Sequence, residues 1–315
     1  MQIEQPIIQV SGLSRLYKEV RAVSDLNFVV QPGDLFGLVG PDGAGKTTTL
    51  RLLAGLLSIS EGEASVAGMD LKSESEGVKS RIGYMAQEFS LYAELSVVEN
   101  LRFFADIYDV PVGEMDQRME RLLGFANLLG FKDRRADKLS GGMQKKLALA
   151  CCLIHEPKIL LLDEPTTGVD PISRREFWNI LNQLHLAGTT ILVSTPYMDE
   201  ADRCSKIGLM YQGEMIMHAS PREIRQQIDG EIVILLTDNW KKAREIVSNF
   251  PGVQEVQTYG EALHIIVDDA DKRIKQFERN LKKANITHQG LRSAPARMEE
   301  AFISLMHKME ERDVV

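Results

Sequence analysis

Apolar residues follow two patterns along the chain before residue 230. Continuous apolar runs predict strands buried on both faces, as in a parallel sheet. They lie at 35–39, 159–162 and 190–194. Apolar residues at helical spacing occupy 49–57 and 172–186, and predict buried helices. Strands that alternate with helices in this way predict an α/β domain.

Shorter strands and a block of helices complete this part of the chain. Further strands are expected at 7–10, 25–30, 64–66, 81–85, 207–211 and 214–218. From Glu88 to Ile154 the pattern is helical, with helices at 97–108, at 114–129 and after Gly142. We therefore expect a helical subdomain at about residues 88–157, inserted between strands of the sheet domain.

The pattern changes again near Gly230. Strands are expected at 231–236, 253–258, 262–267 and 286–292, and helices at 240–249, 271–284 and 297–309. The order strand–helix–strand–strand–helix–strand is typical of a small α+β module of ferredoxin-like fold. We predict two domains, at 1–229 and 230–315. The second carries no evident chemistry, so a packing or dimer-contact role is favoured over a ligand sensor.

The strand at 35–39 runs into a glycine-rich turn that is followed by a helix. The turn reads Gly40, Pro41, Asp42, Gly43, Ala44, Gly45, Lys46, Thr47, Thr48. In this context the pattern GxxxxGK[ST] predicts a phosphate-binding loop. Its glycines let backbone N–H groups approach phosphate oxygens. Lys46 reaches the β- and γ-phosphates, and the Thr47 hydroxyl can ligate Mg²⁺. An ordinary glycine-rich turn is the less favoured alternative.

Two carboxylates, Asp163 and Glu164, follow the buried strand at 159–162. Carboxylates at the end of such a strand are costly unless they face a cation or water. Beside a phosphate loop, a site for a metal ion and water is favoured over a plain turn. For Tyr17, which precedes the loop, a half-buried packing role is favoured over stacking on a purine when the residue is taken alone.

Composition narrows the class of protein. The 315 residues are 44% hydrophobic and 26% charged, as in an ordinary globular protein. The net charge of −8 argues against broad nucleic-acid binding. No apolar run is long enough to span a bilayer, and residues 1–6 lack a signal-peptide pattern. The three cysteines show neither metal-ligand nor redox spacing, so we expect a soluble, cytoplasmic protein.

Several motifs, in one order, resemble those of ATP-binding cassette (ABC) ATPase subunits from the N-terminus to about residue 225. They are the phosphate loop 40–48, Gln87, the signature Leu139-Ser140-Gly141-Gly142-Met143, the segment 159–164 and the loop Gly168-Val169-Asp170. The signature distinguishes this family from other phosphate-loop NTPases. The resemblance implies a phosphate-loop NTPase core with an antiparallel β subdomain and the helical insertion.

The resemblance also implies a head-to-tail dimer, either a homodimer or a pair with a sister subunit, that holds two ATP molecules between its chains. Ser140, Gly141 and Gly142 would meet the γ-phosphate held by the other chain, because a glycine-rich helix N-terminus binds anions. Tyr17 would stack on adenine, and Asp170 would lie at the dimer contact.

The remaining implied roles concern hydrolysis. Asp163 would hold Mg²⁺ through its water shell, and Glu164 would be the general base that polarises the attacking water. Gln87 would contact Mg²⁺ or that water and connect the site to a membrane partner. Lys46 would bind the phosphates being cleaved.

Two positions depart from the family pattern. Met143 replaces the usual glutamine of the signature, and Gln144 points elsewhere on the helix. Pro196 occupies the position where the family usually has a histidine that contacts the γ-phosphate. Proline has no side-chain donor and no N–H, so hydrolysis is expected to be slower or differently organised. We expect Thr195 or Tyr197 to supply a substitute donor.

The leading hypothesis is an ATP-hydrolysing subunit that energises a membrane exporter of the drug- and polysaccharide-transporting branch. A separate permease would dock near Gln87 and the helical subdomain, at the cytoplasmic face of the membrane. Candidate contact residues are Phe89, Leu91, Tyr92, Phe103 and Phe104, although a buried core position is the commoner fate for any one of these side chains.

Two other hypotheses stay open. The first is a regulatory subunit that binds ATP, hydrolyses it poorly and pairs with an active sister subunit; Pro196 supports it and Glu164 argues against it. The second is a soluble ABC ATPase that acts on nucleic acid or ribosomes. Such chains usually carry two cassettes or a long coiled coil, and we expect no nucleic-acid partner here.

Overall fold

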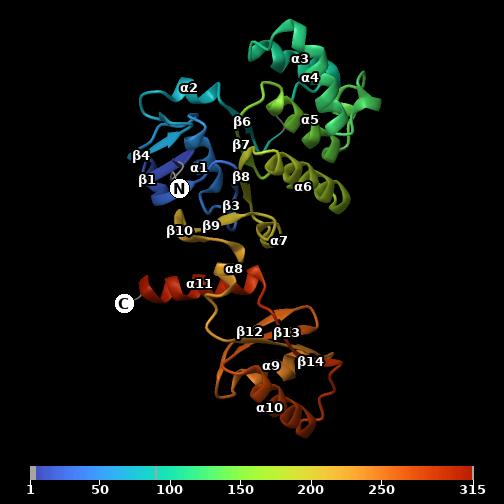
Figure 1. Ribbon diagram of the computed structural model, residues 1–315. Coiled ribbons are helices and arrows are strands. Elements are labelled where there is room, and N and C mark those ends of the chain that lie inside the picture. Colours follow the sequence, from blue (N-terminus) through green and yellow to red (C-terminus); the bar gives the residue numbers. More distant parts are fainter. Residues whose placement is uncertain (1–4, 89–90, 314–315) are drawn as a thin grey trace. The chain divides into compact units, whose positions relative to one another are not determined.

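The computed structural model describes residues 5–88 and 91–313 (Figure 1). Two compact units divide the chain between Pro221 and Arg222. The predicted division at 229/230 lies eight residues after this boundary, so residues 222–229 belong to the second unit. Lys308, near the end of the chain, contacts two of them. Its ammonium donates to the Gln227 carbonyl at 3.2 Å and to the Asp229 carboxylate at 2.6 Å.

A six-stranded sheet forms the centre of the first unit. Its spatial order is β10-β9-β3-β8-β7-β6, with every neighbouring pair parallel except β10 and β9. The bounds are β3 Leu35–Val39, β6 Ile82–Met85, β7 Ile159–Asp163, β8 Thr190–Thr195, β9 Lys206–Tyr211 and β10 Glu214–Ala219. All residues of β3, β7 and β8 are buried, as their continuous apolar runs predict.

A second, antiparallel sheet packs in the same unit, in the order β2-β1-β4-β5. Its strands are β1 Ile8–Tyr17, β2 Val20–Val30, β4 Glu61–Val66 and β5 Met69–Asp70. One apolar core joins residues of both sheets, among them Phe28 and Phe36, whose rings stack at 5.5 Å. The expected antiparallel subdomain and parallel core are therefore confirmed.

Helices occupy the remainder of the first unit. They are α1 Lys46–Leu53, α2 Ser75–Lys79, α3 Val97–Ile107, α4 Val112–Phe125, α5 Gly141–Leu153, α6 Pro171–Leu186 and α7 Met198–Ala201, with 3-10 turns at Leu129–Phe131 and Ala136–Lys138. Figure 1 shows α3, α4 and α5 grouped as a helical subdomain, as predicted. The predicted helix at 114–129 ends early because Asn127 adopts a left-handed conformation, with φ 57°.

The second unit has the predicted ferredoxin-like order. Its elements are α8 Pro221–Arg225 at the boundary, β11 Glu231–Leu236, α9 Trp240–Ser248, β12 Val253–Tyr259, β13 Ala262–Val267, α10 Ala270–Lys283, β14 Gly290–Ala294 and α11 Met298–Asp313. The sheet order β12-β13-β11-β14 is antiparallel throughout. β14 begins later than predicted, because Asn285 is left-handed and Ile286 is buried in the helix-side core.

One buried polar pair joins β13 to α11 within this unit. The imidazole Nδ1 of His264 contacts the Glu300 carboxylate, and both side chains are almost fully buried. The other carboxylate oxygen of Glu300 accepts the backbone N–H of Arg297, at the start of α11. The Tyr259 ring lies 4.5 Å from the imidazole. The pair therefore fixes the first turn of α11 against the sheet.

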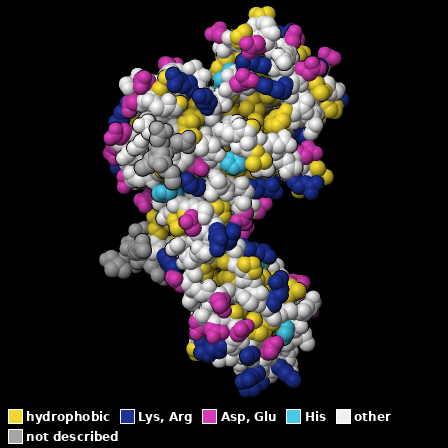
Figure 2. Space-filling model, viewed as in Figure 1, with side chains coloured by type: hydrophobic (Ala, Val, Ile, Leu, Met, Phe, Trp, Pro, Cys, Tyr) yellow, Lys and Arg dark blue, Asp and Glu magenta, His cyan; other side chains and the backbone are white. Residues whose placement is uncertain are grey.

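Figure 2 shows acidic and basic side chains interspersed over the visible face. In the described part of the chain, no helix combines the length and the apolar character that crossing a bilayer requires.

Candidate nucleotide-binding site

The predicted phosphate loop connects β3 to α1. Gly43 has φ 79°, and Gly45, the residue before α1, has φ 96°, a conformation that side chains with a Cβ rarely adopt. A Cβ on Gly40 would lie 2.1 Å from the Met210 carbonyl oxygen, so this position accepts only glycine without a shift of backbone. The loop therefore bends tightly and leads directly into the N-terminus of α1, where backbone N–H groups favour anions.

A cavity of about 420 Å³ lies beside this loop. Its lining residues are Ala22, Asp42, Gly43, Ala44, Gly45, Lys46, Thr47, Thr48, Gln87 and Glu164. The fold thus brings the loop, the predicted glutamine and the predicted base to one cavity. Gly40 and Pro41 contribute through their carbonyl groups, which contact Lys46.

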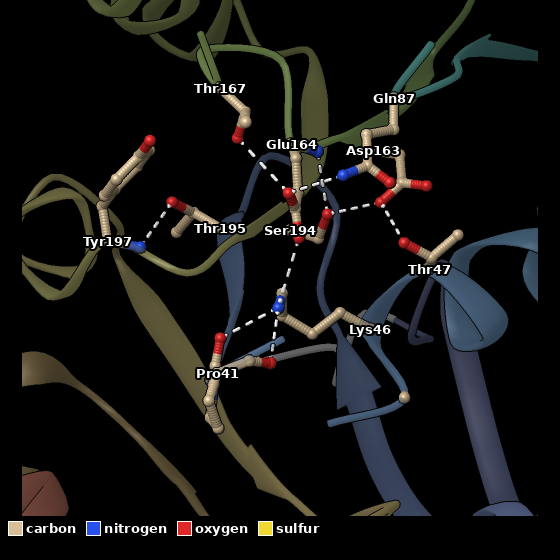
Figure 3. Close-up of polar contacts among 12 residues, drawn as sticks. Pro41, Lys46, Thr47, Gln87, Asp163, Glu164, Thr167, Ser194, Thr195 and Tyr197 are labelled. Carbon is tan, nitrogen blue, oxygen red and sulfur yellow. Dashed lines mark hydrogen bonds and ion pairs between the residues drawn. The ribbon is translucent and has the colours of Figure 1, made fainter. Parts of the chain in front are cut away.

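Lys46 is buried at the bottom of the site, with 3% of its side chain exposed. Its ammonium donates to the carbonyl oxygens of Gly40 and Pro41, each at 2.9 Å. It also lies 3.3 Å from Oε1 of Glu164 (Figure 3). Three acceptors match the three N–H bonds of an ammonium, so its charge is fully satisfied inside the protein.

Asp163, at the end of β7, is fully buried. Its Oδ1 accepts hydrogen bonds from the hydroxyls of Thr47, at 2.9 Å, and Ser194, at 2.7 Å. Its Oδ2 is buried and has no partner among the described residues. A buried carboxylate oxygen without a donor is costly unless something binds it. Together with the Thr47 hydroxyl, this oxygen makes a donor set that fits Mg²⁺, which prefers oxygen ligands and water.

Glu164 is held on both its backbone and its side chain. Its backbone is left-handed, with φ 45°, and its N–H donates to the Ser194 hydroxyl at 2.9 Å. Oε2 accepts from Nε2 of Gln87 at 2.9 Å and from the Thr167 hydroxyl at 3.3 Å. Sequence reasoning missed Ser194 and Thr167; Ser194 pairs with Asp163 in the register of β7 and β8, which no sequence pattern reveals.

The two substitute donors expected next to Pro196 are engaged elsewhere, so that expectation is wrong. The Thr195 hydroxyl donates to Glu200 at 2.5 Å and accepts the backbone N–H of Tyr197 at 3.1 Å. The Tyr197 ring lies against the guanidinium of Arg174, 4.2 Å from the ring centre, and points away from Lys46 in Figure 3. Neither residue lines the cavity.

Glu200, on α7, is a buried acceptor that binds three segments of the chain near Pro196. Its Oε1 accepts from the Thr166 hydroxyl at 2.7 Å and from Nε of Arg174 at 2.6 Å, and its Oε2 accepts from Thr195. These donors come from the loop after Glu164, from α6 and from the end of β8. Glu200 therefore joins three segments that surround the site.

The signature residues lie outside this cavity. Ser140 is the residue before α5, and its hydroxyl accepts the backbone N–H of Met143 at 3.3 Å. Ser140 and Gly141 are exposed, whereas a Cβ on Gly142 would lie 2.5 Å from the Ser173 side chain of α6. An exposed helix N-terminus can meet an anion supplied by another molecule, so the implied role of these residues across a dimer stays a prediction.

Tyr17 and Asp170, whose roles the family resemblance implies, also lie outside the cavity. Tyr17 ends β1, is 40% exposed and packs its ring against the Arg15 guanidinium at 4.8 Å. Asp170 caps α6 by accepting the backbone N–H groups of Ile172 and Ser173, each at 3.0 Å. The hydrogen bond from Ser173 is the main cause that lowers the pKa of the Asp170 carboxyl. Adenine stacking and dimer contact thus remain predictions for these residues.

Comparison with known proteins gives one consistent result. The family model described as "ABC transporter" matches residues 23–167. The probable multidrug ABC transporter ATP-binding protein YbhF of Escherichia coli (strain K12) is 43% identical over 223 residues, which are 71% of this chain and 39% of YbhF. The chain thus spans about two fifths of the length of that relative.

Two further similarities extend this result. The Nod factor export ATP-binding protein I of Ralstonia nicotianae is 35% identical over 306 residues, which cover 95% of this chain and 94% of that protein. Among solved structures, a dimeric ATP-binding cassette in a post-hydrolysis state bound to ADP and Pi is 25% identical, with a TM-score of 0.62, and covers 68% of this chain and 98% of its own.

Proposed function

The chain belongs to the ABC transporter family of ATP-binding proteins, and from this premise we propose that it binds and hydrolyses ATP to energise a multi-chain membrane exporter. The observation that carries the proposal is one cavity that joins Lys46, Thr47, Gln87 and Glu164, with Asp163 directly behind it. The names of the multidrug and Nod factor relatives support export as the direction of transport.

The first task of these residues is to bind the phosphates of ATP. Residues of the loop and of the N-terminus of α1 line the cavity, and the backbone N–H groups at a helix N-terminus attract negative charge. Lys46 keeps its two carbonyl partners but must exchange Glu164 for a phosphate oxygen. Nucleotide binding therefore frees the Glu164 carboxylate from its cation.

Mg²⁺ would be held by the Thr47 hydroxyl and by the unpartnered Oδ2 of Asp163, directly or through water, with Gln87 nearby. When bound, the ion neutralises charge on the phosphate oxygens. Ser194 keeps the other Asp163 oxygen in place and leaves the unpartnered one available to the ion.

Glu164 would act as the general base. Gln87 and Thr167 both donate to its Oε2 and fix the direction of the carboxylate. A water molecule held there gives a proton to Glu164 while its oxygen bonds to the γ-phosphorus. The bond from that phosphorus to the bridging oxygen breaks, and ADP and phosphate leave.

The exposed tip of α5, with Ser140, Gly141 and Gly142, would complete the site of a second chain in a head-to-tail dimer. The dimeric cassette among the similar structures supports the pairing of two chains. ATP would close the pair by adding contacts across two γ-phosphates, and hydrolysis would remove them.

A separate permease would dock on the helical subdomain and place the chain at the cytoplasmic face of the membrane. Tyr92 is exposed and packs edge-on against Phe103 at 4.3 Å, and Phe104 continues this aromatic group. Leu91 is buried and is therefore a core residue instead of a contact. Phe89 lies outside the described residues. Apolar side chains are visible on this subdomain in Figure 2.

The proposal is tested by ATP turnover and by pairing. Native chain should hydrolyse ATP, and Glu164→Gln should reduce the rate by at least about a hundredfold. With Mg-ATP, Glu164→Gln should form a stable dimer in size-exclusion chromatography, with residues 46 and 140 of opposite chains close enough to cross-link. Exposed Glu94→Gln is the matched control. A native chain no more active than Glu164→Gln would refute the hydrolytic function.

A specific observation favours one second candidate, a regulatory subunit that binds ATP but hydrolyses it poorly. Pro196 offers no donor, and both neighbouring side chains are engaged away from the cavity. In that case the purified chain is inactive alone, Pro196→His raises its turnover, and an active sister subunit co-purifies with it and the permease. The transported molecule would be chosen by the permease.

A further inference from the structure

Lys145, two residues after the signature on α5, contacts the catalytic region of its own chain. Its ammonium donates to the backbone carbonyl oxygen of Gln87 at 2.9 Å. Gln87 lies just after β6, and its side chain donates to Glu164. A single lysine on α5 therefore holds the backbone of the residue that orients the proposed base.

The surroundings of Lys145 indicate a specific role. The side chain is partly buried; desolvation lowers the pKa of its ammonium, while the charges of Asp163 and Glu164 act in the opposite direction. The next residue, Lys146, instead contacts Glu176 of α6 at 2.5 Å. Lys145 is thus the lysine of this helix whose ammonium contacts the backbone of Gln87.

The position of α5 gives this contact a consequence. The helix is continuous over Gly141–Leu153, and Ser140 caps its N-terminus. Lys145 lies five positions after Ser140 in the sequence, which is about 7.5 Å along the helix axis. Any displacement of the helix tip therefore moves the Lys145 ammonium, and with it the Gln87 carbonyl.

We infer that Lys145 is a positioning residue that couples the two ATP sites of the dimer. This inference rests on the proposed function, in which the Ser140 tip meets the nucleotide of the partner. When that nucleotide draws in the tip, Lys145 sets Gln87, and Gln87 sets Glu164 in the same chain. Each chain then readies its own base only after the opposite site is filled.

Cooperativity is the property to measure, because a merely structural lysine would not change it. We expect the native chain to bind and hydrolyse ATP with a Hill coefficient approaching the number of sites, which is two. Lys145→Met should lower kcat by about tenfold and bring the Hill coefficient close to one. Lys145→Arg, which keeps the donor, should restore most of both. Exposed Lys138→Met, beside the same signature, should behave as native.

A double-mutant cycle of Ser140→Ala and Lys145→Met separates coupling from local damage. If Lys145 transmits the state of the tip, the double variant is little worse than either single one. Additive losses, or a Lys145→Met chain with native cooperativity, overturn the inference and leave the proposed function intact. If hydrolysis is absent altogether, the proposed function fails, and the cooperativity of ATP binding still decides the coupling. A chain that binds ATP without pairing overturns both.

Discussion

Replacement of Glu200 by glutamine is the most informative test of the fold around the site. Glu200 is fully buried and accepts hydrogen bonds from Thr166, Arg174 and Thr195. A glutamine has nearly the same shape but only one acceptor oxygen and no charge. It can keep Thr166 and Arg174 on that oxygen, but its amide group faces the Thr195 hydroxyl, and Arg174 loses its buried counter-charge.

The size of the effect follows from these contacts. Removal of one partner of a fully buried ion pair costs about 3–5 kcal/mol. The Arg174 side chain is 23% exposed and keeps Asp199 at 2.7 Å, so solvent and this second acid reduce the loss. We expect Glu200→Gln to lower the free energy of unfolding of the first unit by about 2–3 kcal/mol. For a unit of this size, that corresponds to a fall in Tm of about 4–12 °C.

Calorimetry or thermal circular dichroism measures this shift, and Asp199→Asn is the matched control. Asp199 also contacts Arg174 but is 67% exposed, so its loss should cost less than about 1 kcal/mol. Turnover of Glu200→Gln should also fall, because Thr166 and Thr195 adjoin Glu164 and Pro196. A Tm shift no larger than that of Asp199→Asn refutes the reasoning, as does an Arg174→Met, Glu200→Gln pair whose losses simply add.

Three further changes test other parts of the structure. Phe277→Ala removes a fully buried ring from the core of the second unit and should lower the free energy of unfolding by about 3–5 kcal/mol. Amide hydrogen exchange should then accelerate in residues 222–313, while the affinity for ATP is retained. Unchanged exchange rates would show that Phe277 does not stabilise this core. The hydrogen bond from Arg121 lowers the pKa of Glu156, so its contribution is present above the ordinary pKa of a glutamate and is lost as pH falls through the folded-state pKa. Glu156→Gln should therefore cost about 0.5–1 kcal/mol in urea unfolding at pH 7 and nothing near pH 2, whereas a loss that persists in acid excludes an ionic cause. Ser96→Ala removes the hydroxyl that caps α3 and should lower the free energy of unfolding by about 1 kcal/mol, whereas Ser96→Thr, the control, keeps a hydroxyl. Equal unfolding midpoints for the native chain and both variants would show that the cap does not contribute to stability.

Much of the site could be predicted because its residues follow strands that are neighbours in one parallel sheet. Lys46 and Thr47 come after β3, and Asp163 ends β7, with β8 between them. Because carboxyl ends of parallel strands share one edge, loop and carboxylates had to meet. The residue types themselves predicted which groups would bind phosphate, which would bind Mg²⁺ and which would act as the base.

The remaining contacts depend on register and side-chain reach, which a single sequence does not encode locally. Ser194 reaches Asp163 because β7 and β8 pair at that register, and Lys145 reaches Gln87 across a subdomain boundary. The same limit explains why the expectation of a substitute donor at Thr195 or Tyr197 is wrong. Both are next to Pro196 in sequence, yet the buried Glu200 and the guanidinium of Arg174 draw them away from the nucleotide cavity.

The pair of His264 and Glu300 bears on how this protein can be shortened in the laboratory. A chain cut before α11 would leave the imidazole without its acid and would remove Met298 and Ala301, which are buried in the intact chain. Such a fragment should expose apolar surface that α11 now covers, and should therefore self-associate. The C-terminal boundary for expression is therefore best placed after this helix. If a truncated chain aggregates, the cause lies in its C-terminal module and gives no information about its nucleotide site.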